Sequence, residues 1–455
     1  MSGPSSISAP ELQRRVVQLM QQDQGGQALG LLDQVVDAEP ARVDARLLRG
    51  DVLAALCRYQ EALGAYRDAR ALEPQNVRAL SSEGSALLRL QQVEAALTVF
   101  DKALSLATHV PGTWYNRGLA LAGLNRVKDA LADFDRAIEI SGDYALAHIN
   151  RAMLLLLTGR YREGFAEFEA RFGIEPGSRE LRNYREPRWR KGNAIEGKRI
   201  LIYAEQGMGD VIQFARFIPR IAARAAHVTL EVHPPLVRLL QTLPCEVVPL
   251  GGRLAPFNLH SPIVSLGTLL DVEMETVPAE VPYLSAPEAD AVRWRAKLAA
   301  LPGKLKVGLA WSGNPQHNND VNRSLPFAQL ETLFDVPNVS FVNLQKDVRE
   351  SDRAAAGVAR MFDAAGEVGD FADTAAVIAN LDLVIAADTA VAHLAGALGK
   401  PVWILVPFAP DWRWMLERRD NAWYPTAQLF RQAAIGDWSS AVDGVKRALE
   451  AQLSR

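Results

Sequence analysis

A period of 34 residues runs through the first third of the chain and limits its fold more than any other feature. Pro40 and Pro74 lie one period apart, and Pro176 follows Pro74 by three periods. Blocks that start at residues 9, 43, 77, 111 and 145 then follow one another without a gap. A unit of this length cannot bury an apolar face alone, so the period predicts helical repeats that stack on their neighbours.

Three positions in these blocks show a recurring pattern of side-chain size. Position 8 reads Val16, Gly50, Gly84, Gly118 and Ala152. Position 20 reads Ala28, Ala62, Ala96, Ala130 and Gly164, and position 24 reads Leu32, Tyr66, Phe100, Phe134 and Phe168. Small residues let paired helices approach, and we expect the large residue to fill the gap between repeats. This is the tetratricopeptide signature, and it predicts an α-solenoid of about five repeats over residues 9–176, in a domain of residues 1–177.

Position 6 of the last two blocks is an asparagine, Asn116 and Asn150. An asparagine amide both donates and accepts hydrogen bonds, so it can pair with any peptide group. The arrangement is similar to the tetratricopeptide arm of protein O-GlcNAc transferases, in which asparagines at this position hold a peptide backbone. The resemblance implies that both residues bind a polypeptide acceptor. The alternative is that they are ordinary polar residues of a helix surface.

The rest of the chain alternates apolar runs with helix-forming segments. One set of strands is expected at Ile200–Tyr203, Val228–Val232, Val247–Leu250 and Ile263–Leu266. A second set is expected at Val307–Trp311, Ser340–Leu344, Leu383–Ala386 and Val402–Val406. Parallel strands with helices between them form doubly wound sheets, so the pattern predicts two Rossmann-like α/β domains that face a cleft.

The expected boundaries of these domains are residues 199–285 and 286–438. The proline-rich stretch from Val277 to Pro287 is the expected hinge between them. A terminal segment, residues 439–455, holds a helix from Ser439 to Leu453 that we expect to pack back across the hinge.

A basic linker, residues 178–198, joins the repeats to the first sheet domain. With Arg199 it holds eight Lys or Arg residues against three Glu. It is either a solvated connection or a basic lip that helps an anionic ligand to approach.

The segment from Leu381 to Leu405 predicts a strand, a turn, a helix and a second strand. Asp388 and Thr389 stand where the first strand ends, and His393 lies about one turn into the helix. The unpaired N–H groups and positive end of a helix suit a phosphate. The alternative is that Asp388 or Thr389 caps the helix and that His393 is packed in the core.

Two more segments have a similar form. In Arg199–Phe214, Gly207 and Gly209 allow a tight turn before Asp210 opens a helix. This is half of a dinucleotide fingerprint and is a weak signal alone. Lys306–Pro326 is a strand followed by a polar loop that offers groups to anions.

Together these segments resemble the ADP-heptose:lipopolysaccharide heptosyltransferase family of GT-B glycosyltransferases, from about Lys198 to the C-terminus. The resemblance implies that Asp210 is the catalytic base, in the turn formed by Gly207 and Gly209. Arg323 stands where the family usually has a lysine. The donor-binding residues that the resemblance implies are Trp311, Ser312, Gly313, Asn314, Arg323, Gln345, Asp388, Thr389 and His393.

Composition excludes several other classes. A net charge of −3 argues against a nucleic-acid binder, and no apolar run is long enough to span a membrane. The first ten residues lack a secretory signal, and Cys57 and Cys245 form no disulfide framework, so we expect a reducing cytoplasm. The seven His residues are scattered, which predicts no metal site and no cofactor besides the donor.

The expected function is inverting, metal-independent transfer of a sugar from a nucleotide donor to a protein held by the repeats. Two alternatives remain open. The acceptor could be a lipid-linked or cell-surface glycan, with the repeats used for assembly, or the chain could be a non-catalytic scaffold. Self-association into a homo-oligomer also stays open.

Overall fold

The computed structural model describes residues 7–174, 182, 184–317 and 319–454. The chain forms two compact units, Met1–Leu154 and Leu155–Arg455. Pro176 and the start of the basic linker lie outside the described residues, so the repeat phase rests on the helices themselves.

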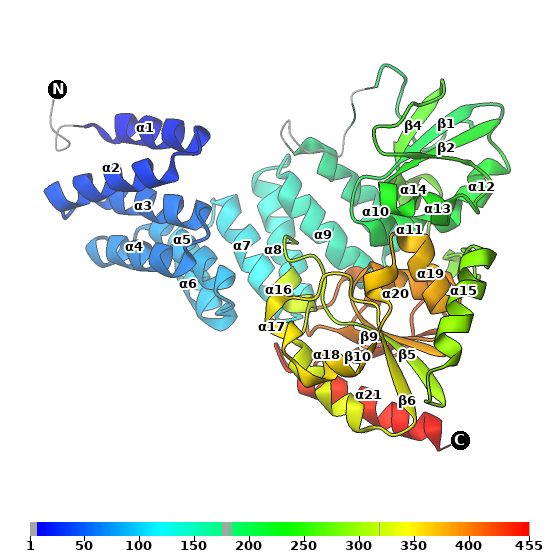
Figure 1. Ribbon diagram of the computed structural model, residues 1–455. Helices are drawn as coiled ribbons and strands as arrows, with labels where there is room; N and C mark the ends of the chain where they lie inside the picture. The colour runs from blue at the N-terminus through cyan, green and yellow to red at the C-terminus, as the bar shows by residue number, and fades with distance from the viewer. Residues whose placement is uncertain (1–6, 175–181, 183, 318, 455) are drawn as a thin grey trace. The chain divides into compact units, whose positions relative to one another are not determined.

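The first unit is a helical array, as its period predicts (Figure 1). Its helices are α1 (Ala9–Gln21), α2 (Gly25–Ala38), α3 (Val43–Ala55), α4 (Tyr59–Leu72), α5 (Val77–Arg89), α6 (Val93–Leu106), α7 (Pro111–Gly123), α8 (Val127–Ile140) and α9 (Ala145–Leu157), the last of which crosses the boundary between the units. The first helix of each repeat begins at residue 9, 43, 77, 111 or 145. The blocks read from the sequence are therefore the helix pairs.

The glycine at position 8 and the aromatic ring at position 24 meet within one repeat. A Cβ added to Gly84 would lie 2.5 Å from the ring of Phe100, and one added to Gly118 would lie 2.6 Å from Phe134. Real Cβ atoms do not approach a ring so closely, so only glycine allows this spacing of the two helices. The large residue thus packs between the two helices of its own repeat, and not in the gap to the next repeat as expected.

A single left-handed residue turns the chain between the two helices of each repeat. The backbone angle φ is 58° at Asp23, 59° at Cys57, 61° at Gln91 and 57° at Asn125, and it is 83° at Gly159. These residues are one period apart. Four of them carry a side chain, for which this conformation costs about 1–2 kcal/mol.

The second unit contains two parallel sheets. The N-terminal sheet has the strand order β3-β2-β1-β4. Its strands are β1 (Arg199–Tyr203), β2 (His227–Val232), β3 (Glu246–Pro249) and β4 (Leu259–Pro262). After β1 come α11 (Met208–Phe214), η3 (Ala215–Phe217) and α12 (Ile218–Ala222), and η4 (Pro234–Leu236) with α13 (Val237–Leu240) follows β2.

The strand expected at Ile263–Leu266 is wrong. The strand β4 ends at Pro262, and the next residues form η5 (Ile263–Ser265) and α14 (Leu266–Leu269). A short buried apolar run has the same composition in a strand and in a buried helix, so its period could not separate the two.

The C-terminal sheet has the order β10-β9-β8-β5-β6-β7. Its strands are β5 (Leu305–Ala310), β6 (Val339–Asn343), β7 (Phe362–Asp363), β8 (Leu383–Ala387), β9 (Val402–Val406) and β10 (Ala427–Arg431). Successive strands run outward from β5 on one side and from β8 on the other. The topological switch point, where ligands bind in doubly wound sheets, therefore lies at the carboxyl ends of β5 and β8.

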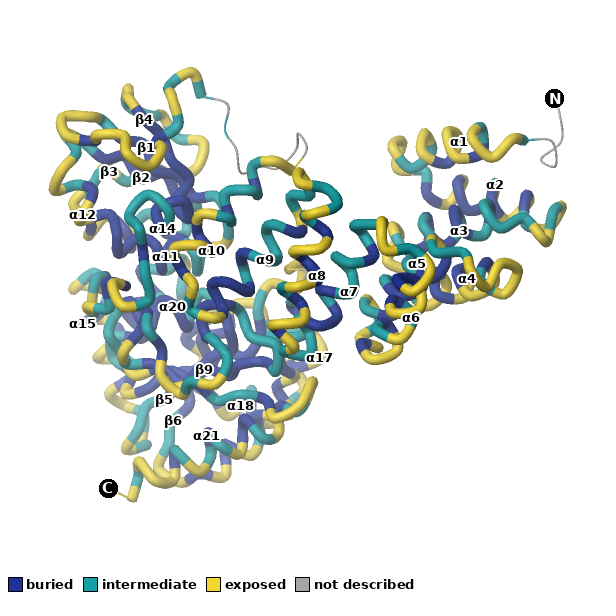
Figure 2. The backbone as a smooth tube through the Cα atoms, turned by 180° about the vertical axis from the view of Figure 1, so that it is seen from behind, coloured by how far each residue is buried: buried dark blue, intermediate teal, exposed yellow. Residues whose placement is uncertain are grey.

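Helices and short turns cover this sheet, whose strands are mostly buried in Figure 2. They are α15 (Glu288–Ala299), α16 (Asp320–Arg323), η7 (Phe327–Asp335), α17 (Glu350–Arg353), α18 (Ala356–Arg360), η8 (Ala365–Glu367), α19 (Phe371–Ala379), α20 (Ala390–Ala397), η9 (Trp412–Trp414) and α21 (Trp438–Leu453). The hinge expected at Val277–Pro287 does connect the two sheets, between η6 (Met274–Thr276) and α15.

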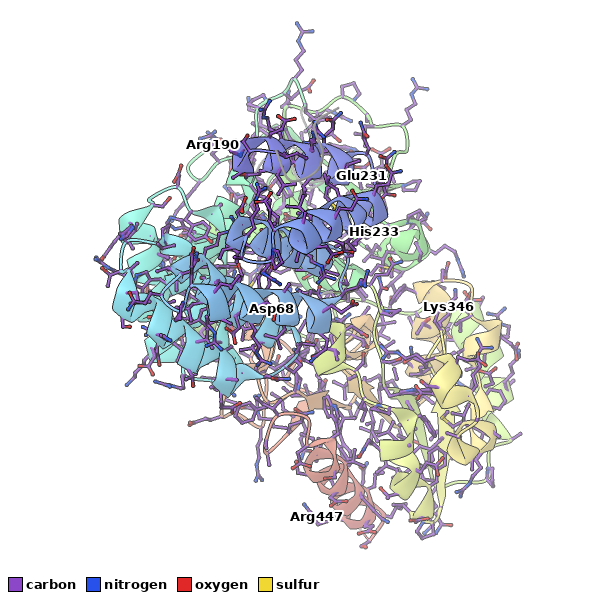
Figure 3. The ribbon with its side chains drawn as sticks, turned by 90° about the vertical axis from the view of Figure 1, so that its left-hand side faces the viewer. Asp68, Arg190, Glu231, His233, Lys346 and Arg447 are labelled. Atoms are coloured by element: carbon purple, nitrogen blue, oxygen red, sulfur yellow. The ribbon has the colours of Figure 1, made fainter. Side chains whose placement is uncertain are left out.

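The terminal helix α21 packs on the sheet of its own domain. It contacts η7, β9 and β10, and Val445 and Leu449 share one apolar cluster with Trp403 and Leu405. The expectation that it packs across the hinge is therefore wrong. Its buried face is apolar at helical spacing, and Arg447, labelled in Figure 3, lies on the exposed side.

The helix α10 (Tyr161–Phe168) has the sequence of a repeat but is packed into the second unit. The indole N–H of Trp423 donates to the hydroxyl of Tyr161 at 3.1 Å. The ring of Phe165 lies edge-on to Trp412, and a Cβ on Gly267 would lie 2.5 Å from it. The expected boundary at residue 177 assigns α10 to the array, whereas the structure groups this helix with the two sheets.

An ion pair follows α10 in η2 (Glu169–Gly173). The guanidinium of Arg171 contacts both carboxylate oxygens of Glu205, at 2.9 and 3.0 Å, and donates to Ser265 at 2.7 Å. Both charged side chains are almost fully buried. Glu205 follows β1, so this pair fixes η2 to the carboxyl end of the N-terminal sheet.

The described part of the basic linker is docked rather than solvated. The backbone N–H of Trp189 donates to the carbonyl of His260 in β4 at 2.7 Å, so the segment extends the sheet. Arg188 forms an ion pair with Glu169. Arg190, labelled in Figure 3, is exposed. In the described part of the segment, Arg182 and Lys191 are also paired, with Glu231 and Asp271, so these charges are partly neutralised. The basic lip stays a prediction.

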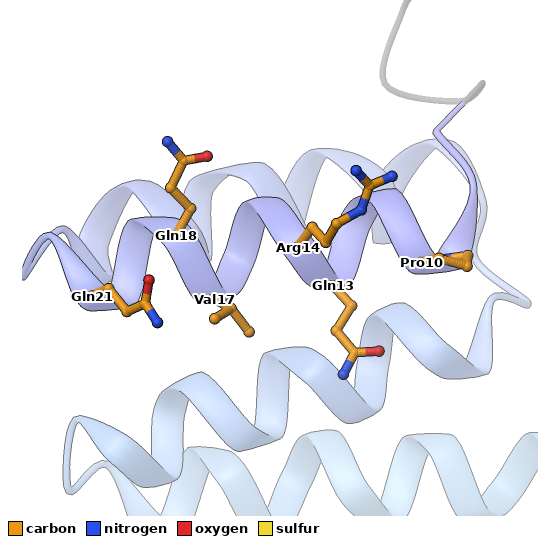
Figure 4. A pocket seen from close by; sticks show the side chains of 6 residues that line it. All are labelled: Pro10, Gln13, Arg14, Val17, Gln18 and Gln21. Carbon is orange, nitrogen blue, oxygen red and sulfur yellow. The ribbon is translucent and has the colours of Figure 1, made fainter. Parts of the chain in front are cut away.

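A hollow of about 400 Å³ lies on one face of α1 in the first unit (Figure 4). It is lined by Pro10, Gln13, Arg14, Val17, Gln18 and Gln21. These side chains include no acid–base pair, so the hollow is not the candidate active site. No helix among the described residues is long and apolar enough to cross a membrane.

Candidate active site

The start of α20 lies at the switch point of the C-terminal sheet. Thr389 occupies the N-cap position, but within the described part of the chain no side chain caps this helix. The hydroxyl of Thr389 is buried and has no hydrogen-bond partner among the described residues. The capping alternative for Thr389 is therefore wrong, and the first turn of α20 keeps free N–H groups that suit an anion.

The start of α11 meets α20 from the other sheet. The helix begins at Met208, so Gly209 and Asp210 lie in its first turn, and the expectation that Asp210 opens the helix is two residues late. A Cβ on Gly209 would lie 2.8 Å from Cδ2 of His393 and 3.5 Å from Cα of Ala390. Only a glycine allows this approach. The structure thus brings Gly207, Gly209 and Asp210 to the helix that starts after Thr389.

His393 is buried, and its Nδ1 lies 2.9 Å from the hydroxyl of Tyr424. Its ring also packs near Trp414, with the centroids 5.4 Å apart. Burial, together with the charges of Arg413, Arg216 and Arg323, lowers the pKa of His393 well below its usual range. The imidazole is therefore neutral at pH 7, and its main contacts hold the core of the site.

The polar loop after β5 is held by Gln345. Its side-chain oxygen accepts the N–H groups of Trp311 at 3.1 Å and Ser312 at 3.0 Å, and Ser324 accepts the N–H of Gly313 at 2.9 Å. These three N–H groups are already paired and are not available for a diphosphate. This differs from the expectation that the loop offers them to the donor. Gln345 is itself buried, so its role here is to fix the loop.

Other residues predicted in this loop differ in access. The ring of Trp311 is fully buried, and its N–H donates to Asp352 at 2.9 Å, so this side chain belongs to the core. That Trp311 contacts the donor stays a prediction. The hydroxyl of Ser312 is buried without a partner among the described residues. Asn314 is exposed, and its side chain accepts the N–H of Gln316.

Arg323 connects the loop after β5 with the end of β8. Its guanidinium covers Gly313, where a Cβ would lie 2.6 Å from Nη2. Its Nη1 donates to the backbone carbonyl of Asp388 at 3.2 Å. Its Nε is buried, lies 3.9 Å from Asp320, and makes no hydrogen bond with any described residue. The guanidinium therefore offers an unused donor beside the open start of α20.

Burial raises the pKa of Asp388 to about 7; Asp411 adds to the rise, and Arg413 opposes it. Burial also raises the pKa of Asp210, with the same two neighbours acting in the same directions. Carboxyl groups with a raised pKa are typical of sites that bind or transfer protons. The side chain of Asp210 keeps 16% of its surface exposed, so a substrate can reach it.

Two arginines of the site were not predicted from the sequence. Arg413, in the loop after β9, forms an ion pair with Asp210. Arg216 follows α11 and donates to the carbonyls of Pro278 and Trp423, both at 2.8 Å. Neither residue belongs to a glycine turn or a periodic pattern. The only feature of the sequence that could have indicated Arg413 is the pair of tryptophans beside it, Trp412 and Trp414.

Within the described residues, no group of three or more His, Cys, Asp or Glu is placed to hold a metal ion. Asn116 and Asn150 lie in the first unit. There, Asn116 donates to the hydroxyl of Ser85 at 3.1 Å, and Asn150 donates to the hydroxyl of Tyr115 at 3.2 Å and the carbonyl of Leu146 at 2.9 Å. Both amides thus join successive repeats.

Models of known families match two parts of the chain. The tetratricopeptide repeat model matches residues 17–69, 56–111 and 113–173. The model of glycosyltransferase family 9 (heptosyltransferase) matches residues 338–405, which hold β6, β7, β8, the whole of α20 and all but the last residue of β9.

Among known proteins, Protein FlbA of Caulobacter vibrioides is 30% identical over 287 residues, which are 58% of this chain and 48% of that protein. The chain thus spans about half the length of this relative. Two solved repeat proteins are similar to the first third. One is TTC0263, a thermophilic TPR protein in Thermus thermophilus (21% identity, 37% of this chain, 93% of that chain, TM-score 0.34). The other is MamA from Desulfovibrio magneticus RS-1 (20% identity, 36% and 91%, TM-score 0.31).

These matches support the coarser part of the predicted family. The chain carries tetratricopeptide repeats, and its C-terminal parallel sheet contains a segment similar to glycosyltransferase family 9.

Proposed function

We propose that the protein is a glycosyltransferase that moves a sugar from a nucleotide donor to a polypeptide. The observation that carries the proposal is the uncapped start of α20 beside Arg323, at the switch point of a sheet of which residues 338–405 match a glycosyltransferase family. In this proposal the two sheet domains have the GT-B arrangement.

The donor diphosphate would bind to the first turn of α20, near Thr389 and the hydroxyl of Ser312. Arg323 would add a fixed positive charge, which stabilises the negative charge that develops on the leaving nucleotide. The protein thus offers its own cation for this purpose, and we propose that the transfer needs no metal. The uncapped first turn of α20 and the unused Nε of Arg323 support this assignment.

Asp210 would act as the general base. The acceptor oxygen forms a bond to the anomeric carbon while the bond from that carbon to the diphosphate oxygen breaks. The electron pair of the broken bond leaves with the nucleoside diphosphate, and the acceptor proton passes to Asp210. Attack opposite to the leaving group inverts the anomeric centre. The raised pKa and partial exposure of Asp210 suit this role.

The first test is binding of nucleotides. At 100 times the dissociation constant, a ligand adds about 2.7 kcal/mol to stability, so one of ADP, GDP, UDP, CDP or CMP should raise the melting temperature by a few degrees, with or without EDTA. Arg323→Gln should weaken this binding. Arg353→Gln is the matched control, because Arg353 lies in the same domain with 66% of its side chain exposed. No shift with any nucleotide would contradict the donor site.

The acceptor is proposed to bind along the repeats, with the side-chain oxygens of Asn116 and Asn150 facing its backbone N–H groups. A hydrogen bond contributes about 0.5–1.5 kcal/mol net, so Asn116→Ala with Asn150→Ala should raise the acceptor KM several-fold or more. Hydrolysis of the donor without acceptor should not change.

A second candidate is transfer to a glycan, with the repeats used for assembly. The inter-repeat hydrogen bonds of Asn116 and Asn150 favour it, because they give both residues a structural role. An unchanged KM for a protein acceptor in the double variant, together with a lower melting temperature, would support this candidate. An intact-mass screen of proteins and glycans with several nucleotide sugars would decide between the acceptors.

A further inference from the structure

We propose that Arg413 is the positioning residue of the catalytic base: it holds the Asp210 carboxylate in its ionised form at the contact between the two sheets. This inference rests on the proposed function, because it assigns a partner to the base of that reaction. Arg413 lies outside the segment that matches glycosyltransferase family 9.

The geometry fixes Arg413 from all sides. Its Nη2 forms the ion pair with Asp210, and its Nε donates to the side-chain oxygen of Gln213 in the same helix, α11. Its Nη1 donates to Asp411 at 2.9 Å, and Asn421 donates to its backbone carbonyl. Only 10% of the side chain is exposed. A planar guanidinium can satisfy three acceptors in fixed directions, whereas a lysine ammonium cannot reproduce this fork.

The pair joins residues of different domains. Asp210 and Gln213 belong to the helix after β1, and Arg413 belongs to the loop after β9. Arg216 reinforces the same contact, since it binds carbonyls of the hinge and of the tail. The base is therefore complete only when the two sheets are in contact.

Electrostatics shows why the base needs this partner. Burial and the charge of Asp411 both favour the neutral form of Asp210, and Arg413 is the cation that opposes them. Several other groups lie around the pair. Those on the facing elements are Asp388 after β8, the neutral His393 in α20, and Arg323 and His317 in the loop after β5. Without Arg413, the pKa of Asp210 would rise further, and the ionised form that accepts a proton would be lost over more of the pH range.

The test compares Arg413→Gln and Arg413→Lys with the wild type in full pH profiles of kcat. In the glutamine variant, the acidic limb should move up by at least one pH unit, so kcat at a pH on that limb should fall about tenfold, with recovery at higher pH. The lysine variant should restore part of the shift. Arg418→Gln is the matched control, because Arg418 lies in the same loop and pairs with the exposed Asp420. An unchanged acidic limb in Arg413→Gln, with wild-type kcat, would overturn the proposal.

A second measurement does not depend on transfer. Arg413→Gln should melt several degrees below the wild type, because it leaves the Asp210 carboxylate buried without its cation. Adding Asp210→Asn should recover part of that loss. A double variant that melts no higher than Arg413→Gln would overturn the pairing even if the enzyme is active. Recovery of stability in the double variant, together with a wild-type protein that transfers no sugar, would instead contradict the proposed function and leave the pair in place.

Discussion

In the array, the ring of Phe100 meets Gly84, sixteen residues earlier in the same repeat. In the candidate active site, Arg413 meets Asp210 across 203 residues of sequence. The first contact repeats with the period of the chain and depends only on its neighbours. The second exists once and requires both sheets to be folded and in contact. Local changes should therefore stay local in the array and should act on the whole site in the second unit.

The largest expected effect is on the single long-range centre. Asp210→Asn should lower kcat by roughly 10²–10⁴-fold, because it removes the group that accepts the proton. The melting temperature and nucleotide affinity should change little, since asparagine keeps the shape of the side chain and an acceptor for Arg413. Steady-state kinetics and thermal melts would measure both. Equal losses of stability and turnover would mean that Asp210 serves the fold rather than the reaction.

A change in the array should show the opposite behaviour. Phe100→Ala empties the gap at Gly84 and should cost about 3 kcal/mol or more, as other buried Phe-to-Ala changes do. Hydrogen exchange should rise in α5 and α6, while nucleotide binding by the second unit stays at the wild-type level. Phe134→Ala should act in the same way one repeat later. A parallel loss of nucleotide affinity would break the comparison.

The third prediction concerns the pH dependence of the second unit. The pKa of Asp388 is raised to about 7, so between roughly pH 4 and 7 the folded protein keeps a proton that the unfolded chain has lost. Stability then falls as the pH rises, by up to about 1.4 kcal/mol per pH unit. Asp388→Asn removes this dependence. Its melting temperature relative to the wild type should be higher at pH 7.5 than at pH 5, and a constant difference would contradict the raised pKa.

The smallest effect is expected at a turn of the array. Gln91 holds a left-handed conformation that costs about 1–2 kcal/mol with a side chain, and glycine removes that cost while losing about 0.5–1 kcal/mol of backbone entropy. Gln91→Gly should therefore gain roughly 0.5 kcal/mol in urea unfolding. Gln92→Gly is the control and should destabilise, because the φ angle of Gln92 is −94°. Destabilisation by both changes would show that Gln91 makes contacts that matter more than its backbone.

This difference between local and distant contacts also explains what the sequence could predict. The helix starts of the array were readable because one rule repeats in every block. The turns at Gly207 and Thr389 were readable because strand, turn and helix are adjacent in sequence, although α11 starts two residues before the expected Asp210. A strand was predicted at Ile263–Leu266, where β4 has already ended and η5 begins, because a short apolar run fits a strand and a buried helical turn equally well. Arg413 was missed because its partner is distant and its loop has no period.

The same reasoning limits which residues of a local motif can touch a ligand. Trp311 belongs to a loop at the correct edge of the sheet, but its ring turns into the core. The N–H groups beside it are occupied by Gln345, a residue on another strand end. A sequence motif thus placed the loop, whereas tertiary contacts decided which of its groups remain free.

The position of α10 has a consequence for how such chains can be shortened or recombined. By sequence this helix closes the last repeat, yet its rings pack against Trp412 and Trp423, and the segment after it neutralises the buried Glu205. A shortened protein that starts at residue 178 would lack α10 and Arg171. Its Trp412 and Trp423 would lose their apolar contacts, and Glu205 would lose its cation. Exchange of one array for another, by engineering or by genetic recombination, would have to join the new repeats upstream of Tyr161. The boundary between the repeat array and the sheet unit therefore lies inside α9, one helix before α10, with which the 34-residue period ends.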